Sequence, residues 1–314
     1  KMPIVVNSNV AATQASFNLS KSNDALRKSL ERLSSGNRIN SPADDAGGLA
    51  VAYKLDSKLN RTEATIQNAQ NGLSLLQVQD GALETVGKIL DRMAELRTMA
   101  SDITKNSGDI ENYSKEFVEL QSQIFQIQKQ KFNGISLFAV SGSTLNNGGV
   151  SETKTYTSIG ANGTASSVTY TSYGRTLYTA ASGASTDGSI SINIVNLQFI
   201  TSVAGGNIGG FSTGGTFSAT NNITDISIGA FVSAIEKLAD MRAENGAEQN
   251  RVMNSIELLS TNMTNLEAAH GRIMDADIAL ESTRFAKQNV LVQAGAAMTA
   301  QANQLTNVAL QLLG

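Results

Sequence analysis

The chain has 314 residues and a formal net charge of −3, so it lacks the basic field by which nucleic-acid-binding proteins attract phosphate. Cysteine is absent and His270 is the only histidine, which excludes disulfides, thiolate zinc sites, a cysteine nucleophile and any pair of histidines within the chain. We therefore predict no catalytic residue, no cofactor-binding residue and no metal ligand, and a chain that is not an enzyme.

The first residues, KMPIVVNSNVAATQASFNL, lack the basic start and the continuous apolar core of a cleaved secretion signal. No run of about 18 apolar residues occurs, so the sequence predicts no membrane insertion. With only two prolines, Pro3 and Pro42, very long helices are permitted. Composition predicts a helical zone at residues 1–138, a Ser/Thr/Gly/Asn-rich zone at 139–223 and a second helical zone at 224–314.

Apolar residues recur at heptad spacing through the first helical zone. Sustained steps of three and four residues are the signature of helices packed along a shared seam. The first stripe consists of Val5, Ala12, Leu19, Leu26 and Leu33. The same spacing continues at Leu55, Leu59, Ile66, Ala69, Leu73, Leu76, Leu83 and Leu90, and again at Ile110, Tyr113, Phe117, Leu120, Ile124 and Ile127.

The stretch LSSGNRINSPADDAGGLA interrupts these helices. Gly36 is placed to take the left-handed conformation that ends the first helix. Ser41 is predicted to cap the next helix, with Pro42 at its first position and Asp44 completing a capping box. Asp44 and Asp45 both favour the positive end of that helix. The stretch therefore predicts a stiff turn between two helical modules.

The middle zone, residues 139–223, is predicted to form short strands. Its segments SSVTYTSY and GSISINIVNLQFITSV alternate or favour β-branched residues, and glycine pairs between such segments mark turns. A disordered linker is the competing interpretation. The alternation of Ile190, Ile192 and Ile194 favours a small β-rich domain.

The second helical zone has stripes of its own, at Val252, Ile256, Leu259, Met263 and Leu266, and at Leu291, Met298, Leu305 and Leu312. Residues 2–20 and 288–314 carry no charge, although a solvent-facing helix usually presents charges on its outer face. An uncharged helix suits burial against several neighbours, because no ion then has to be desolvated. We expect the two ends to find partners on other copies of the chain; an ordinary intramolecular bundle core is the competing interpretation.

The corner resembles a known family. SLERLSSGNRINSPADDAGGLA closely resembles the N-terminal signature of bacterial flagellins, the subunits of the flagellar filament. The likeness continues through NGLSLLQVQDGALETVGKILDRMAELRTMAS and KQKFNGISLF, and resumes at MRAENGAEQNRVMNSIELLSTNMTNLEAAHGRIMDADIALE. It ends in QAGAAMTAQANQLTNVALQLLG, so that it covers both helical zones in order.

The resemblance implies a mainly α fold: a long antiparallel helical coiled coil formed by the N- and C-terminal regions, with a small β-rich inserted outer domain. The implied modules are an inner one of residues 1–42 plus 272–314, a spoke of residues 43–138 plus 224–271 with a β-hairpin, and the outer domain at 139–223. The resemblance assigns the packing of the filament core to Val5, Ala12, Leu19, Leu26, Leu33, Leu291, Met298, Leu305 and Leu312. It assigns the turn between the inner module and the spoke to Gly36, Arg38, Ser41, Pro42, Asp44 and Asp45.

By the same resemblance, the chain is expected to be a structural subunit that polymerises with other copies into the filament used for swimming. Its terminal helices would line an inner tube, and a flagellar export chaperone and the cap and junction proteins would be further partners. It is expected outside the cell, exported through the flagellar channel without a cleaved signal. The alternative is the flagellin-like hook–filament junction protein. A coiled-coil signalling protein or adhesin would normally need a membrane span or a cleaved signal.

LDRMAELRTMA resembles the spoke helix that animal innate immune receptors grip in many flagellins. Arg92, Glu95 and Leu96 match that motif, whereas Ala94 stands where the recognised forms usually have a second arginine. Lateral packing within the filament is the competing role. Of the remaining candidates, the carboxylates of Asp275, Asp277 and Glu281 lack the spaced oxygen ligands of a calcium loop and are predicted to be structural.

Overall fold

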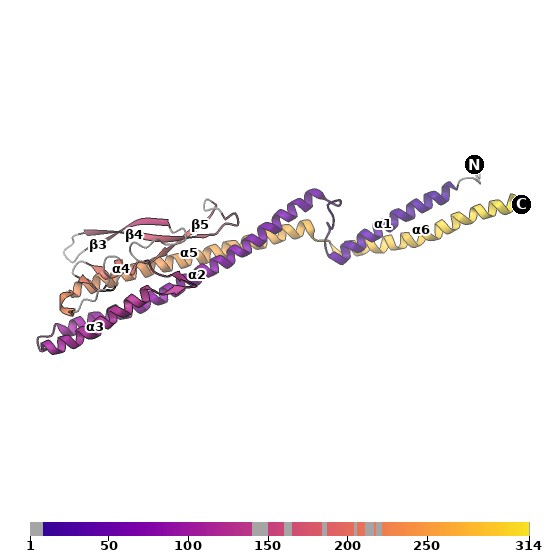
Figure 1. The fold of residues 1–314 in the computed structure, drawn as a ribbon. Helices are drawn as coiled ribbons and strands as arrows, with labels where there is room; N and C mark the ends of the chain where they lie inside the picture. Colours follow the sequence, from indigo (N-terminus) through magenta and orange to yellow (C-terminus); the bar gives the residue numbers. More distant parts are fainter. Residues whose placement is uncertain are drawn as a thin grey trace. The chain divides into compact units, whose positions relative to one another are not determined.

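The computed structural model describes residues 9–139, 150–159, 165–183, 187–203, 206–210, 217 and 222–313. The chain forms two compact units: Lys1–Asn60 with Met263–Gly314, and Arg61–Asn262. Two helices, α2 (Ala46–Ala100) and α5 (Ile228–Met274), contribute residues to both units. The predicted mainly α fold is confirmed (Figure 1). The predicted division into three modules stays a prediction.

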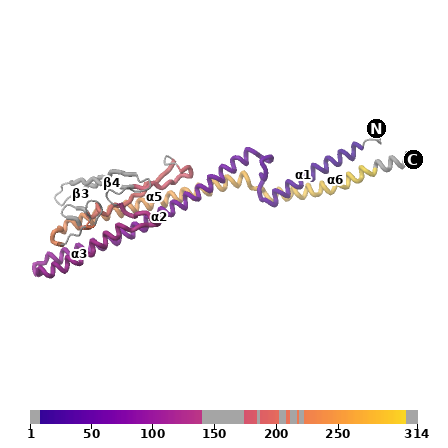
Figure 2. The backbone as a smooth tube through the Cα atoms, in the orientation of Figure 1, coloured from indigo at the N-terminus to yellow at the C-terminus, as the bar shows by residue number. Residues whose placement is uncertain are grey.

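The first unit is built on a pair of helices from opposite ends of the chain. Helix α1 (Val10–Ser35) lies beside α6 (Ile278–Leu313), as Figures 1 and 2 show. The two run antiparallel, because Asn9, before the start of α1, donates to the carbonyl of Ala302 at 2.8 Å, whereas Ser29 near its end donates to Glu281 at 2.6 Å. The same Asn9 caps α1 by accepting from the N–H of Ala12.

The second unit has its core between α2, α5 and a third helix, α3 (Ser107–Gln128). Asn106 starts α3 with a capping box completed by Asp109. Phe117 of α3 and Phe231 of α5 meet edge to face with ring centroids 6.2 Å apart. Among the residues of these three helices, the side chains with at most 1% of their surface exposed in this core are Leu83, Val86, Leu90, Met93, Leu96, Phe117, Ile124, Ala230, Phe231 and Ala234.

The heptad stripes predicted for these helices are confirmed. The interior positions of the stripes are buried, namely Ala69, Leu76, Leu83, Leu90, Phe117, Ile124, Ile127, Val252 and Leu259. The other members of the same stripes are half-buried along the same faces. Apolar side chains at steps of three and four thus pack the long helices against one another.

The strands fall between α3 and α5 in the sequence. Strands β1 (Lys131–Phe132) and β2 (Ile135–Ser136) form the hairpin that the resemblance implied. Three antiparallel strands follow in the order β3 (Val150–Ile159), β4 (Ala165–Tyr178), β5 (Ser189–Ile194). The short pieces that remain are α4 (Leu197–Thr201), β6 (Ser202–Val203), β7 (Gly206–Asn207) and the 3-10 turn η1 (Ile223–Asp225).

Strand β5 joins the sheet to the helices. Ile190, Ile192 and Ile194 are all buried, as their alternation predicted. Ile190 and Ile192 pack in one cluster with Ala69 and Val252 of the helices. The strand therefore belongs to the helical core on one face and to the sheet through its hydrogen bonds with β4.

We expect Phe117→Ala to lower the free energy of unfolding of the second unit by about 3–5 kcal/mol, because the ring is fully buried and its loss leaves a cavity. Urea denaturation followed by circular dichroism measures the change. Phe17→Ala in α1 is the control: the ring of Phe17 is 68% exposed, so its removal should shift stability by no more than about 0.5 kcal/mol. Equal effects of the two substitutions would contradict this core assignment.

Candidate interaction surface of the terminal helices

Helix α1 ends at Gly36, which has the left-handed backbone predicted for it, with φ 73°. Its N–H donates to the carbonyl of Arg32 at 2.9 Å and so satisfies one of the last carbonyl groups of the helix. Glycine tolerates this conformation because it has no Cβ to clash with the following carbonyl. The helix therefore stops at a defined residue.

The predicted cap of the next helix is wrong. Helix α2 begins at Ala46, and Ser41 instead starts a turn in which its carbonyl accepts from the N–H of Asp44 at 3.0 Å. Pro42 takes the second position of that turn, where its fixed φ is favourable. The carboxylate of Asp44 pairs with Lys28 of α1 and accepts from the backbone N–H of Asn40, so it is not available for a capping box.

Asp45 caps α2 in place of Ser41. Its side chain accepts from the N–H of Gly48 at 2.8 Å, and its carbonyl accepts from the N–H of Leu49 at 3.0 Å. An aspartate at this position also lies at the positive end of the helix. The prediction that this carboxylate favours the start of α2 is therefore correct, although the start lies four residues later than Pro42.

The corner pairs with the joint between α5 and α6. The N–H of Arg38 donates to the carbonyl of Met274 at 2.6 Å, and the N–H of Ala276 donates to the carbonyl of Gly36 at 2.9 Å. The guanidinium of Arg38 reaches the carbonyl of Ile273 through Nε and one terminal nitrogen, at 3.2 and 2.8 Å. The turn after α1 and the joint between α5 and α6 are thus hydrogen-bonded to each other, and Arg38 makes most of these hydrogen bonds.

The joint itself is closed by two carboxylates. Asp277 caps α6 by accepting from the N–H groups of Ala279 and Leu280, both at 3.0 Å. Glu281 is buried and accepts from the hydroxyl of Ser29. Its second oxygen lies 3.3 Å from Arg284 and 3.8 Å from Arg32, so the buried charge has cationic partners. Within the described part of the chain, no group of three or more acidic or histidine side chains is arranged to hold a metal ion.

The face on which α1 and α6 meet consists mainly of small and polar residues. Gly295 of α6 lies so close to Leu19 that an added Cβ would be 3.2 Å from the leucine side chain, so the two helices approach closely here. The less exposed positions of α1 are Ala12, Ala15, Leu19, Ser22, Ala25, Leu26, Ser29, Arg32 and Leu33. Among the residues of α6 whose side chains the structure describes, they are Glu281, Phe285, Gln288, Asn289, Val292, Gly295, Thr299 and Ala302.

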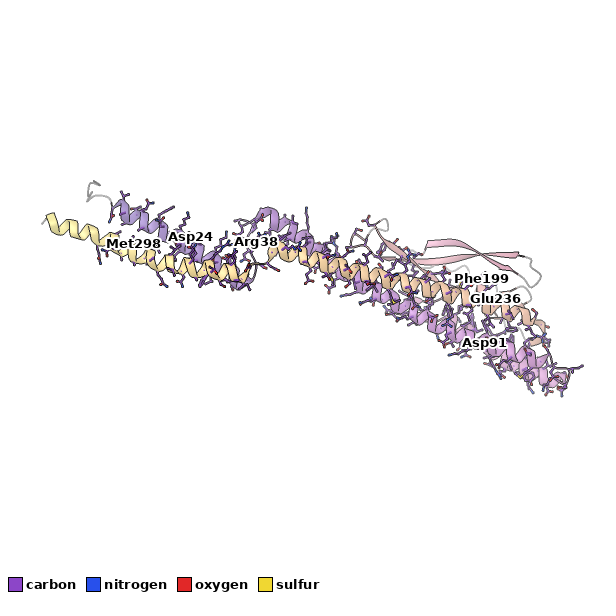
Figure 3. The ribbon with its side chains drawn as sticks, turned by 180° about the vertical axis from the view of Figure 1, so that it is seen from behind. Asp24, Arg38, Asp91, Phe199, Glu236 and Met298 are labelled. Carbon is purple, nitrogen blue, oxygen red and sulfur yellow. The ribbon has the colours of Figure 1, made fainter. Side chains whose placement is uncertain are left out.

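Larger apolar side chains point away from this face. On α6, Val290 is 65% exposed, Leu291 43% and Met298 67%. Met298 is labelled in Figure 3. On α1, Phe17 and Leu30 are exposed as well. These exposed apolar side chains are candidates for contact with a partner.

The structure thus separates residues that the sequence grouped as filament-core packing. Ala12, Leu19, Leu26 and Leu33 lie on the face between α1 and α6 of the same chain. Leu291 and Met298 lie off that face and remain uncovered. Val5 and the side chains of Leu305 and Leu312 lie outside the described residues.

The candidate receptor motif is in the second unit. Arg92 pairs with Glu116 of α3 at 2.8 Å and with Glu95 at 3.1 Å, and these two contacts raise the pKa of its guanidinium. Leu96 has no exposed surface and belongs to the core. Arg92 and Glu95 are therefore the members of this motif that a partner can reach.

Sequence reasoning missed Ser29, Gly295 and the pairing of Glu281. The apolar periodicity points to Leu19, Leu26 and Leu33, which do lie on this face, but not to the small and polar residues between them. Ser29 follows Leu26 by three residues and precedes Leu33 by four, so it lies on the heptad stripe. Small or polar residues at such positions are the signal that could have found this face.

We expect Asp44→Asn to loosen the corner at neutral pH. Its hydrogen bond with Lys28 keeps the pKa of Asp44 below the ordinary value of 3.8, so the contact stabilises the fold above that pH. The advantage over the variant should shrink as pH falls below 3.8 and vanish once pH passes the lowered pKa. Protection of the Arg38 and Ala276 amides against hydrogen exchange, measured on the assembled protein, reports the change. Asp24→Asn, which removes only an exposed pair with Arg27, should leave this protection unaltered at every pH.

Comparison with known proteins gives matches at both ends and over the full length. The family model of the bacterial flagellin N-terminal helical region matches residues 6–143, and that of the C-terminal helical region matches residues 228–313. Flagellin of Bacillus subtilis (strain 168) is 35% identical over 317 residues, covering 98% of this chain and 99% of that protein. The flagellar filament 33 kDa core protein of Treponema phagedenis is 30% identical over 311 residues, covering 99% and 100%. The crystal structure of Bacillus cereus flagellin, 23% identical, covers 65% of this chain and 94% of its own with a TM-score of 0.40.

Proposed function

This chain belongs to the bacterial flagellin family, and on that premise we propose that it is a structural subunit which polymerises into the flagellar filament. Membership of a family of structural proteins agrees with the prediction that it is not an enzyme, and with a place on the extracellular flagellum. The alternative of a hook–filament junction protein is not favoured, because the full-length relatives named above are a flagellin and a filament core protein. No helix of the described residues is long and apolar enough to cross a membrane.

One observation carries the mechanism: α6 presents Val290, Leu291 and Met298 outward, in a stretch of helix that has no charge. Burying one such side chain contributes about 1.5–3 kcal/mol. Fixing the backbone of one residue costs about 1–2 kcal/mol, so a helix that is covered on one face gains little net free energy by ordering. Neighbours that cover the outer face as well make the ordering favourable.

The contact we propose is heterologous: the outer face of α6 meets a different surface on the next copy. Contacts of this type build an open helical assembly when the rotation between copies does not close a ring. In this arrangement α1 and α6 line the inner tube of the filament.

Further partners rest on the family alone. An export chaperone would cover the apolar face of α6 until assembly, and cap and junction proteins would meet the ends of the filament. Export would take place through the flagellar channel. Recognition by an animal innate immune receptor would use Arg92 and Glu95, with Ala94 in place of the second arginine; lateral packing in the filament is the role we favour for this surface.

We expect Met298→Asp to prevent filament growth, because a carboxylate would have to be desolvated in the contact between copies. Negative-stain microscopy of purified protein mixed with preformed seeds shows whether long tubes form. Ser282→Asp, on an exposed position of the charged part of α6, is the matched control and should polymerise normally. Normal filaments from Met298→Asp would exclude this contact.

Folding of the terminal helices should be coupled to polymerisation. Helix α1 has 26 residues and α6 has 36, together about a fifth of the chain, so circular dichroism should gain up to that share of helix when free subunits assemble. Free subunits that already have the full helical signal would show that the two ends fold without neighbours.

A further inference from the structure

The composition of the chain limits which side chains an oxidant can attack. Cysteine and tryptophan are absent, whereas the chain contains 8 methionines. A two-electron oxidant such as a peroxide therefore finds its most reactive target in the thioether of methionine, and it converts this apolar side chain into a polar sulfoxide. Which methionine reacts first depends on how far its side chain is exposed.

Two methionines are exposed among those whose side chains the structure describes. Met298 on α6 has 67% of its surface exposed, and Met253 on α5 has 45%. Met93 and Met241 are buried in the core of the second unit. The other methionines that the structure describes are half-buried, namely Met99, Met263 and Met274. Exposure therefore ranks Met298 first and Met253 second as targets.

Met298 lies on the face of α6 that we propose the next copy covers. Residues 288–314 contain no charged side chain. Leu291 precedes Met298 by seven residues and Val290 precedes it by eight, so the three share one face of the helix, and all three are exposed. Figure 3 labels Met298 on this helix. Its sulfur is therefore open in the free subunit, and in the proposed contact it would be enclosed.

Met253 lies in a different environment. It lines an open groove together with Leu73 of α2 and with Glu257 and Ser260 of α5. Glu257 and Ser260 are exposed, so a sulfoxide at Met253 would remain among solvated polar groups. The contact that we propose for α6 does not include this groove. Met253 is thus a second exposed methionine whose oxidation should leave that contact intact.

We propose that Met298 is an oxidation site that controls assembly: a peroxide converts its thioether to the sulfoxide in the free subunit, and the oxidised subunit cannot join the filament. The sulfur attacks one oxygen of hydrogen peroxide, an S–O bond forms, the O–O bond breaks and the other oxygen leaves as water. The sulfur is oxidised by two electrons and the peroxide is reduced by two. The polar S–O group would have to be desolvated in an apolar contact, which costs free energy.

This inference rests on the proposed function, because it names how the same face of α6 is regulated. Methionine sulfoxide reductases reverse the modification, with one enzyme for each sulfoxide epimer. Both the oxidant and the reductases reach Met298 in a free subunit, whereas neighbours would cover it in the filament. Oxidation therefore acts on subunits before they assemble.

The test compares the full-length wild type with Met298→Leu and Met253→Leu. Leucine has nearly the volume of methionine and no sulfur, so all three untreated proteins should lengthen preformed seeds alike. Free subunits are then treated with hydrogen peroxide, which catalase removes, and peptide mass spectrometry should find more sulfoxide at Met298 than at Met253. Treated wild type and treated Met253→Leu should lengthen seeds about tenfold more slowly, whereas treated Met298→Leu should grow like the untreated protein.

A second measurement needs no substitution. Treated wild type that is incubated with the two epimer-specific reductases should regain its growth rate as Met298 returns to the thioether. The inference is overturned if growth stays slow after this reduction, or if treated wild type grows normally with Met298 oxidised. It is also overturned if treated Met298→Leu slows as much as the wild type, or if Met253 is oxidised faster than Met298.

The untreated wild type separates this inference from the proposed function. If untreated subunits never lengthen seeds, the proposed function is wrong and the inference falls with it. If untreated subunits do lengthen seeds and one of the contrary results above is found, the inference alone is wrong.

Discussion

The constraint on which the structure depends is that the uncharged stretches of α1 and α6, residues 10–20 and 288–313, cover each other on one face only. Helices α1 and α6 meet through small and polar residues together with Leu19, Leu26 and Leu33, and Gly295 allows a close approach beside Leu19. The larger side chains, Phe17 on α1 and Val290 and Met298 on α6, are left outward. These exposed side chains are the ones that we propose other copies of the chain cover.

The second unit, in contrast, buries its large apolar side chains within the chain. Its helices bury large apolar side chains such as Phe117 and Leu83, and they place amides among them at the points where the inserted chain docks. Each buried amide stabilises only when its partner is present, so the polar groups fix the position of the insertion rather than adding much free energy. The second unit is stabilised within the chain, whereas we propose that contacts with other copies complete the pair of α1 and α6.

The helices and their apolar faces could be predicted from the sequence, because apolar periodicity reports burial directly. The stripe through Phe117 and Ile124 and the alternation at Ile190 and Ile192 are cases of this. The cap of α2 was misplaced because Ser41 and Asp45 satisfy the same local rule, and only the pairing of Asp44 with Lys28 decides between them. Gln79 was missed because an amide breaks an apolar pattern, although its place three residues after Leu76 keeps the spacing. Apolar periodicity shows which positions are buried, but it does not show which group a polar side chain will hydrogen-bond.

The two hydrogen bonds that Gln79 donates to the main chain have a mechanical consequence. The amide of Gln79 holds the main chain on both sides of the inserted segment, at Leu137 and at Asn193, so a pull on that segment would load both hydrogen bonds at once. Force applied to the inserted segment would therefore be shared within the second unit between α2, through Gln79, and α5, through Glu244 and Glu248.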